Sequence, residues 1–165
     1  MNLYLKQKVF SWGDSFTVYD ENGNDKYYVE GEIFTFGKKL HIYDLSGNEL
    51  CFIYQKLMSF LPKYFISKNG VDIAQVIKNF TFFHQSYSVD GFGWEVEGDF
   101  FAHDYEITGA DSGRTVATVS KHWFTFGDAY EISIADGIND IDALAVVLVI
   151  DACLAASQSA AASST

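Results

Sequence analysis

The sequence predicts an all-β domain with one helix: a closed antiparallel barrel of about twelve strands around a buried, hydrophobic C-terminal helix. Two observations lead to this prediction. First, a phrase made of a basic residue, two aromatic residues and an apolar residue occurs four times, with the alternation of a β-strand inside each copy. Second, the alternation stops after Gly137, and residues 143–156 are apolar on nearly every face of a helix. A helix of that kind is buried on all sides.

The four copies of this basic-aromatic phrase share the same order of residue types with single-residue slips. They are Lys8, Trp12, Phe16, Val18; Lys56, Phe60, Tyr64, Ile66; Lys78, Phe82, Tyr87, Val89; and Lys121, Phe126, Tyr130, Ile132. A longer similarity links residues 29–34, which read VEGEIF, with residues 96–101, which read VEGDFF. Gly31 and Gly98 lie inside these strand patterns, where glycine marks a bulge or the close approach of another backbone. We expect both glycines to be structural.

Turn signals such as Asn22-Gly23, Asn69-Gly70 and Asp90-Gly91 separate segments of strand length. Spacing this regular is typical of an antiparallel meander or barrel. The predicted strands lie near residues 3–11, 15–20, 26–34, 38–44, 49–56, 62–68, 71–77, 80–89, 93–101, 104–110, 114–121 and 128–134.

A single helix fits the space that twelve strands enclose. Strands about 4.8 Å apart and tilted by about 40° give a barrel radius of roughly 12 Å, and a helix with its side chains is about 10–12 Å across. The helix is predicted over about 140–155, with Asn139 or Asp140 as the N-cap. Residues 1–155 then form one barrel domain around the central helix, and the Ser/Ala-rich residues 156–165 form a flexible tail.

Composition narrows the classes of function. The chain has 165 residues and a formal net charge of −11, which disfavours nucleic acid as a partner. Cys51 and Cys153 lie in apolar runs without a secretory signal before them, so we expect free thiols in the cytoplasm. The longest apolar stretch, residues 143–150, is far shorter than the roughly 18 residues of a membrane span. We therefore expect a cytoplasmic protein with no transmembrane segment.

Several segments match, in order, the pattern of a known family. These are the opening LYLKQKVFSWGDSFTVYDENG, the segment YYVEGEIFTFGKKLHIYD with Gln55-Lys56 after it, and the late VEGDFF and FGDAYEI. Together with the strand order and the final helix, they resemble the LURP-one-related family over about residues 3–151. That family resembles a branch of the tubby C-terminal-like barrels, with the phospholipid scramblases as relatives. The resemblance implies no catalytic motif and no cofactor, and it implies phosphoinositide head groups as one class of ligand.

Lysines are the candidate lipid-binding residues. If the basic-aromatic phrase places its lysines at equivalent barrel positions, they form a basic ring or patch; otherwise their stems cover apolar neighbours at the surface. Lys38 and Lys39 are either a head-group site or a solvated hairpin end. The candidates are Lys38, Lys39, Lys8, Lys56, Lys78 and Lys121.

Acidic residues have structural rather than chemical roles in this prediction. Asp14 and Asp128 occupy matching places in WGD and FGD, where an aspartate accepts hydrogen bonds from a tight turn. Asp151 interrupts the apolar helix, and a carboxylate there must be solvated, paired with a lysine or bonded by tyrosine hydroxyls. The acidic residues of 136–142 fit helix capping better than a calcium loop, and the four histidines have no zinc-ligand spacing. No metal is predicted.

The leading functional hypothesis is a non-enzymatic cytoplasmic binding or scaffold protein of the LURP-one-related type, with an unknown ligand or protein partner. No catalytic residue and no cofactor is predicted, because P-loop, dinucleotide and nucleophile-elbow motifs are all absent from the sequence. Two alternatives stay open. One is phosphoinositide or anionic-lipid recognition through a local basic patch, and the other is a lipid-handling enzyme. The oligomeric state is open.

Overall fold

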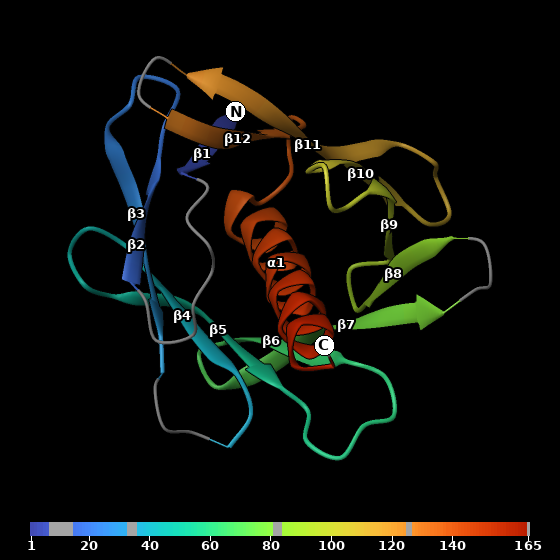
Figure 1. Cartoon of the computed structure of the whole chain (residues 1–165). Coiled ribbons are helices and arrows are strands. Elements are labelled where there is room, and N and C mark those ends of the chain that lie inside the picture. Colours follow the sequence, from blue (N-terminus) through green and yellow to red (C-terminus); the bar gives the residue numbers. More distant parts are fainter. Residues whose placement is uncertain (7–14, 33–35, 81–83, 125–126, 165) are drawn as a thin grey trace.

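The computed structural model describes residues 1–6, 15–32, 36–80, 84–124 and 127–164. These residues form twelve strands in a closed antiparallel barrel and one C-terminal helix, which confirms the predicted fold (Figure 1). The elements are β1 (Asn2–Lys6), β2 (Ser15–Tyr19), β3 (Asp25–Gly31), β4 (Lys39–Tyr43), β5 (Glu49–Gln55), β6 (Lys63–Lys68), β7 (Val71–Phe80), β8 (Gln85–Asp90), β9 (Trp94–Asp99), β10 (Asp104–Gly109), β11 (Thr115–Phe124), β12 (Gly127–Ile134) and α1 (Asp140–Ser163).

The barrel is a simple meander in which each strand pairs with the next along the chain. It closes where β1 pairs with β12, with Leu3 opposite Ile132 and Leu5 opposite Tyr130. Closure removes the unpaired strand edge that invites association with other chains. Along each strand the side chains alternate between faces: on β4, Leu40 and Ile42 are buried in the interior while His41 faces outward.

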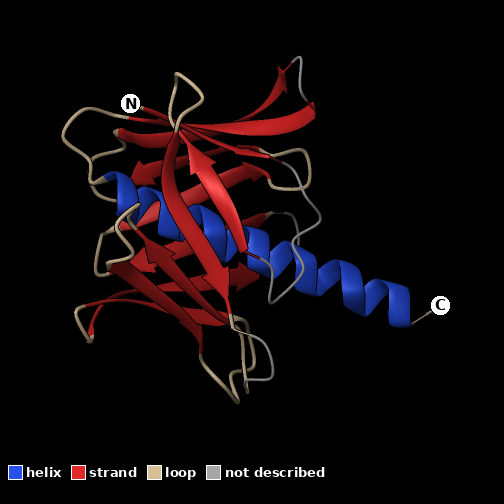
Figure 2. Ribbon diagram, turned by 90° about the vertical axis from the view of Figure 1, so that its left-hand side faces the viewer, coloured by secondary structure: helices blue, strands red, loops and turns tan. Residues whose placement is uncertain are grey.

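Helix α1 fills the barrel interior along its axis, as the sequence predicts (Figure 1). Asn139 is the N-cap, and its side chain accepts a hydrogen bond of 3.2 Å from the Asp142 backbone nitrogen. Residues 141 and 143–154 are buried, and the helix then emerges from one end of the barrel (Figure 2). It continues to Ser163, past the predicted end near residue 155, because this segment is rich in alanine, the strongest helix former. Flexibility of residues 156–165 stays a prediction.

The two ends of the barrel differ in their connections. At one end, which we call the turn end, short turns join β2 to β3 and β4 to β5 with the same design. Asp20 accepts hydrogen bonds from the backbone nitrogens of Asn22 and Asn24, and Asp44 accepts the corresponding bonds from its own turn. The backbone and side-chain hydrogen bonds from Asn24 hold the pKa of the Asp20 carboxyl below its usual value. The side-chain bond from Asn48, together with the backbone bonds, does the same for the pKa of Asp44. At the opposite end, which we call the loop end, α1 emerges from the barrel (Figure 2), and residues 56–62 form the described connection between β5 and β6.

Candidate functional site

Most of the described lysines lie at the loop end. Because adjacent strands are antiparallel, the ends of β1, β5, β7 and β11 and the starts of β4 and β6 share this end. Lys8 lies outside the described residues. The loop-end lysines are Lys6, Lys38, Lys39, Lys56, Lys63, Lys78 and Lys121.

The lysines of the basic-aromatic phrase do not all face the same way. Lys78 lies directly opposite Tyr87, and Lys121 lies directly opposite Tyr130, so both lysines are on the interior face of the sheet. In the β5–β6 hairpin, Gln55 is the residue opposite Tyr64. Lys56 is one residue further along and therefore belongs to the outer face, because a one-residue shift changes the face of a strand. The phrase gathers these lysines at one end without forming a uniform ring.

Lys38 and Lys78 approach the helix where it leaves the barrel. Burial raises the pKa of the Cys153 thiol to about 11, while the nearby ammonium groups of Lys78 and Lys38 act in the opposite direction. Burial also lowers the pKa of Lys38. Lys39, which faces outward, instead forms an ion pair of 3.2 Å with Glu32. The two neighbouring lysines thus have different surroundings, and only Lys38 faces the helix.

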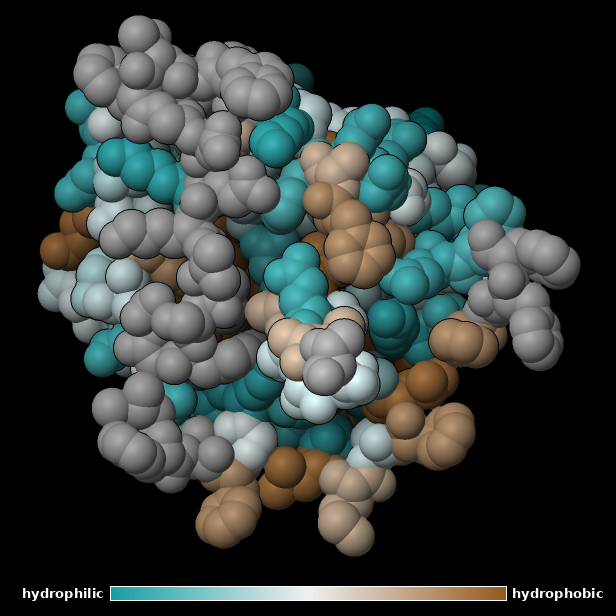
Figure 3. All heavy atoms as spheres, in the orientation of Figure 1, coloured by the Kyte–Doolittle hydropathy of each residue, from teal (hydrophilic) through white to brown (hydrophobic). Residues whose placement is uncertain are grey.

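Exposed apolar side chains gather at the same end. Met58 and Phe60 are fully exposed, and Phe36 is 92% exposed. Leu57, Phe80 and Phe101 complete a set of six among the ten large hydrophobic side chains that are exposed in the described part of the chain. In Figure 3, which looks onto the loop end, brown side chains lie around the end of α1 with hydrophilic side chains between them. We call these six residues the apolar rim.

Acidic residues concentrate at the turn end. Their carboxylates stand on the short turns and on the strand ends beside them, on the side of the barrel opposite the apolar rim. They include Asp20, Glu21, Asp25, Asp44, Glu49, Asp72, Asp90, Asp111, Asp136, Asp140 and Asp142. The net charge of −11 is therefore unevenly distributed, and the loop end is the more basic end.

Asp151 is buried just inside the loop end. Its side chain is 8% exposed, and one carboxylate oxygen accepts a hydrogen bond from the Tyr130 hydroxyl. The other oxygen lies 3.5 Å from Nε2 of His103, whose ring stacks on Tyr130 with 4.7 Å between centroids. Tyr105 is also buried close by. We call Asp151, Tyr130, His103 and Tyr105 the Asp151 cluster.

Gly98 lies in this region opposite Tyr105, with φ at 140°. A Cβ atom on Gly98 would lie 2.5 Å from the Tyr105 Cα, so the two backbones approach too closely for any side chain. Gly31, the other strand glycine, is buried opposite Leu40 at the end of β3. Asp14 lies outside the described residues, and Asp128 is opposite Trp123 in the β11–β12 hairpin, with its side chain outside the described part.

A shallow pocket of about 310 Å³ lies on the outer face of β3 and β4, and no sequence pattern indicated it. His41 is its central polar side chain, with Nδ1 2.7 Å from Glu49 and Nε2 2.8 Å from Glu32. The bond from His41 holds the pKa of Glu32 below its usual value. Each carboxylate already has a partner, so this network stabilises the outer face of the sheet. The pocket is lined by Glu30, Gly31, Glu32, His41 and Tyr43.

The acidic residues in the first turn of α1 are paired with neighbouring side chains. Asp140 accepts a hydrogen bond of 2.6 Å from the Tyr27 hydroxyl, and Asp142 forms an ion pair of 2.7 Å with Lys68. Within the described ranges, no three His, Cys, Asp or Glu side chains come together in a metal-binding group. Cys51 and Cys153 are free and buried, as predicted. Of the helices that the structure describes, none has the length and apolar character needed to cross a membrane.

A closed twelve-stranded meander barrel with its C-terminal helix along the axis defines the class of this protein. The model of the LURP-one-related family matches residues 1–151, and the chain belongs to that family. It is similar to the uncharacterised protein YxjI of Bacillus subtilis (strain 168), with 36% identity over 151 residues and 92% of each chain covered. It is also similar to the X-ray structure of an Arabidopsis thaliana protein, with a TM-score of 0.64, 16% identity and coverage of 92% of this chain and 91% of that one. This structural likeness supports the fold alone.

Proposed function

We propose that this chain is a non-enzymatic binding protein and that the loop end of its barrel is the binding surface. The observation that carries the proposal is the apolar rim, which exposes six large hydrophobic side chains around the emerging helix. Exposed apolar groups that gather in one region are typical of interaction sites rather than of an ordinary solvated surface. The turn end, by contrast, includes two short turns in which Asp20 and Asp44 accept hydrogen bonds from the backbone of their own turn.

An anionic membrane surface is the partner that this end favours, because the apolar rim and seven lysines share it. Aromatic and aliphatic side chains enter the membrane interface, and each lysine near an anionic surface contributes about 1 kcal/mol. Strands of about seven residues keep the acidic turn end roughly 20 Å from the rim. That separation exceeds the screening length of about 8 Å at physiological salt. The carboxylates of the turn end therefore oppose this contact only weakly.

Binding to lipid vesicles tests the proposal. In co-sedimentation with neutral, phosphatidylserine-containing and phosphoinositide-containing vesicles, we expect binding to the anionic vesicles that weakens as salt increases. The double substitution Met58→Ser with Phe60→Ser removes the two most exposed rim side chains and should reduce binding at least about tenfold, since each buried apolar side chain contributes about 1.5–3 kcal/mol.

Leu45→Ser is the matched control for this experiment. Leu45 is 65% exposed in the β4–β5 turn, at the opposite end of the barrel, and its loss should leave binding unchanged. Equal binding by the double variant and the wild type would remove the apolar rim as the membrane contact. If the protein binds none of the vesicles at any salt concentration, an anionic membrane is excluded as the partner. The loop end would then be proposed to bind another protein.

A further inference from the structure

Three side chains that can bind a metal contact one another where α1 leaves the barrel, and a fourth, that of Tyr105, is buried near Asp151. Asp151 comes from α1, Tyr130 from β12, Tyr105 from β10, and His103 from the connection between β9 and β10. Tyr130 bonds one carboxylate oxygen of Asp151, and Nε2 of His103 lies 3.5 Å from the other. His103 has φ at 52°, in the left-handed region that is uncommon for residues other than glycine. The loop thus brings the imidazole to the buried carboxylate in a constrained conformation.

Two oxygen atoms of this cluster lack a hydrogen-bond partner among the described residues. They are Oδ1 of Asp151 and the hydroxyl of Tyr105, whose residues are 8% and 4% exposed. Burial, and after it the Asp151 carboxylate, hold the pKa of Tyr105 well above its usual value, so the two groups are near each other. Buried polar groups nearly always have a partner. A bound ion that both oxygens could reach would give each of them a partner.

We propose that the Asp151 cluster is a binding site for ferric iron, with Asp151, Tyr130, Tyr105 and His103 as its protein ligands. The donors are one carboxylate, two phenol oxygens and one imidazole nitrogen. Tyrosine is an established ligand of haem iron, and imidazole also suits iron. On binding, the phenols of Tyr105 and Tyr130 release their protons to solvent, and the metal takes the place of both protons.

Charge balance selects a trivalent ion for this site. The carboxylate and two phenolates together carry three negative charges, while the imidazole is neutral when it binds a metal. A net charge in a buried site is costly. The three positive charges of a ferric ion neutralise the three negative charges of its ligands. Structural zinc, in contrast, is held mainly by cysteine and histidine. The donors of the Asp151 cluster therefore differ from the cysteine and histidine sets of structural zinc sites.

Addition of ferric citrate to the chelator-treated protein tests this proposal. Ferric iron bound by tyrosinate absorbs visible light, so we expect a visible band that saturates at one iron per chain. Tyr105→Phe removes only a hydroxyl that has no described hydrogen-bond partner, and it should leave thermal unfolding close to wild type. The same variant should weaken iron binding at least about tenfold. Asp151→Asn should abolish the band.

Tyr64→Phe is the control, because Tyr64 is an equally buried interior tyrosine whose charged and polar neighbours are Cys153 and Tyr87 instead of Asp151. It should keep the band. Absence of the band in the wild-type protein would overturn the proposal. A band that Tyr105→Phe leaves unchanged would also overturn it, because the iron would then be bound elsewhere. If Asp151→Asn fails to fold, the comparison between Tyr105→Phe and Tyr64→Phe decides the outcome alone.

Discussion

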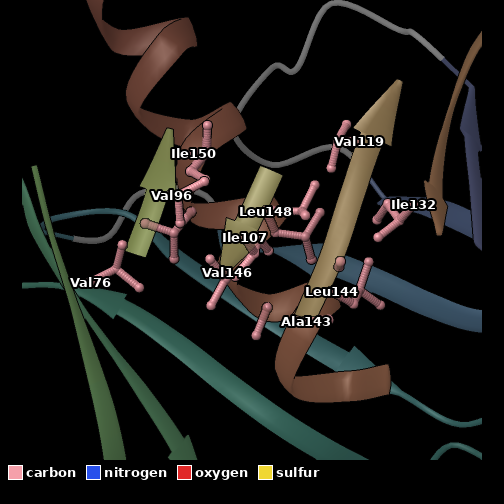
Figure 4. Close-up of a cluster of buried hydrophobic side chains, with 14 of the residues drawn as sticks. Val76, Val96, Ile107, Val119, Ile132, Ala143, Leu144, Val146, Leu148 and Ile150 are labelled. Carbon is pink, nitrogen blue, oxygen red and sulfur yellow. The ribbon is translucent and has the colours of Figure 1, made fainter. Parts of the chain in front are cut away.

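Replacement of Leu148 by aspartate is expected to prevent this chain from folding. Leu148 is completely buried in the middle of α1, and Figure 4 shows its side chain near Ile107 and Val119 from the surrounding strands. An unpaired charge at this position costs several kcal/mol, which is a large part of the about 5–15 kcal/mol that stabilises a typical domain. Circular dichroism and gel filtration would show loss of the folded state at 25 °C.

Ala161→Asp is the matched control, since residue 161 lies in the exposed part of the same helix. Its effect on the free energy of unfolding should stay within about 0.5 kcal/mol. The prediction depends on α1 filling the barrel along its axis and forming the centre of its core. A chain truncated before Ile141 that kept the full stability of the wild type would contradict that view, because the barrel would then hold without its core helix.

Gly98→Ala is expected to have the next largest effect, a loss of about 3–5 kcal/mol in the free energy of unfolding. A Cβ atom at residue 98 would lie 2.5 Å from the Tyr105 Cα and 2.6 Å from the Asp104 carbonyl oxygen. These neighbours belong to the paired backbone of β10 and cannot move aside without breaking the sheet. Overpacking costs about 1–3 kcal/mol, and the positive φ of 140° adds about 1–3 kcal/mol of strain.

Gly113→Ala separates these two contributions in the same urea-unfolding experiment. Gly113 also has a positive φ, 63°, but no heavy atom lies within 4 Å of the position where its Cβ would be. Its substitution should therefore cost only about 1 kcal/mol. Equal losses for Gly98→Ala and Gly113→Ala would mean that the close approach between β9 and β10 contributes nothing to the requirement for glycine.

The fold could be predicted from the sequence because its signals are local. Each strand carries alternating apolar residues, turn residues separate the strands, and residues 143–156 are apolar around the whole helix. The end of α1 was harder to predict. Residues after Ala156 are alanine and serine with little else, a composition that suits both a flexible tail and an exposed helix. In the structure the helical conformation extends to Ser163.

The candidate site could be predicted only in part. One of the two interpretations of the basic-aromatic phrase places its lysines at equivalent barrel positions, and the three that the structure describes, Lys56, Lys78 and Lys121, lie at the loop end. The single-residue slip at Lys56 changes its face, which only the register of β5 against β6 reveals. The Asp151 cluster has no sequence motif, because its residues come from three strands or loops and the helix. The apolar rim could not be predicted, because the sequence does not show which apolar side chains of the connections remain exposed to solvent.

A fluorescent label at each end of the barrel tests the central claim most directly. Phe60→Cys places a label on the apolar rim, and Leu45→Cys places the same label at the turn end. The native thiols react slowly, since burial raises the pKa of Cys51 to about 12 and that of Cys153 to about 11. On addition of anionic vesicles, we expect the emission of an environment-sensitive label to shift to shorter wavelength at position 60 and to stay unchanged at position 45. A shift at position 45, with none at position 60, would contradict binding through the loop end.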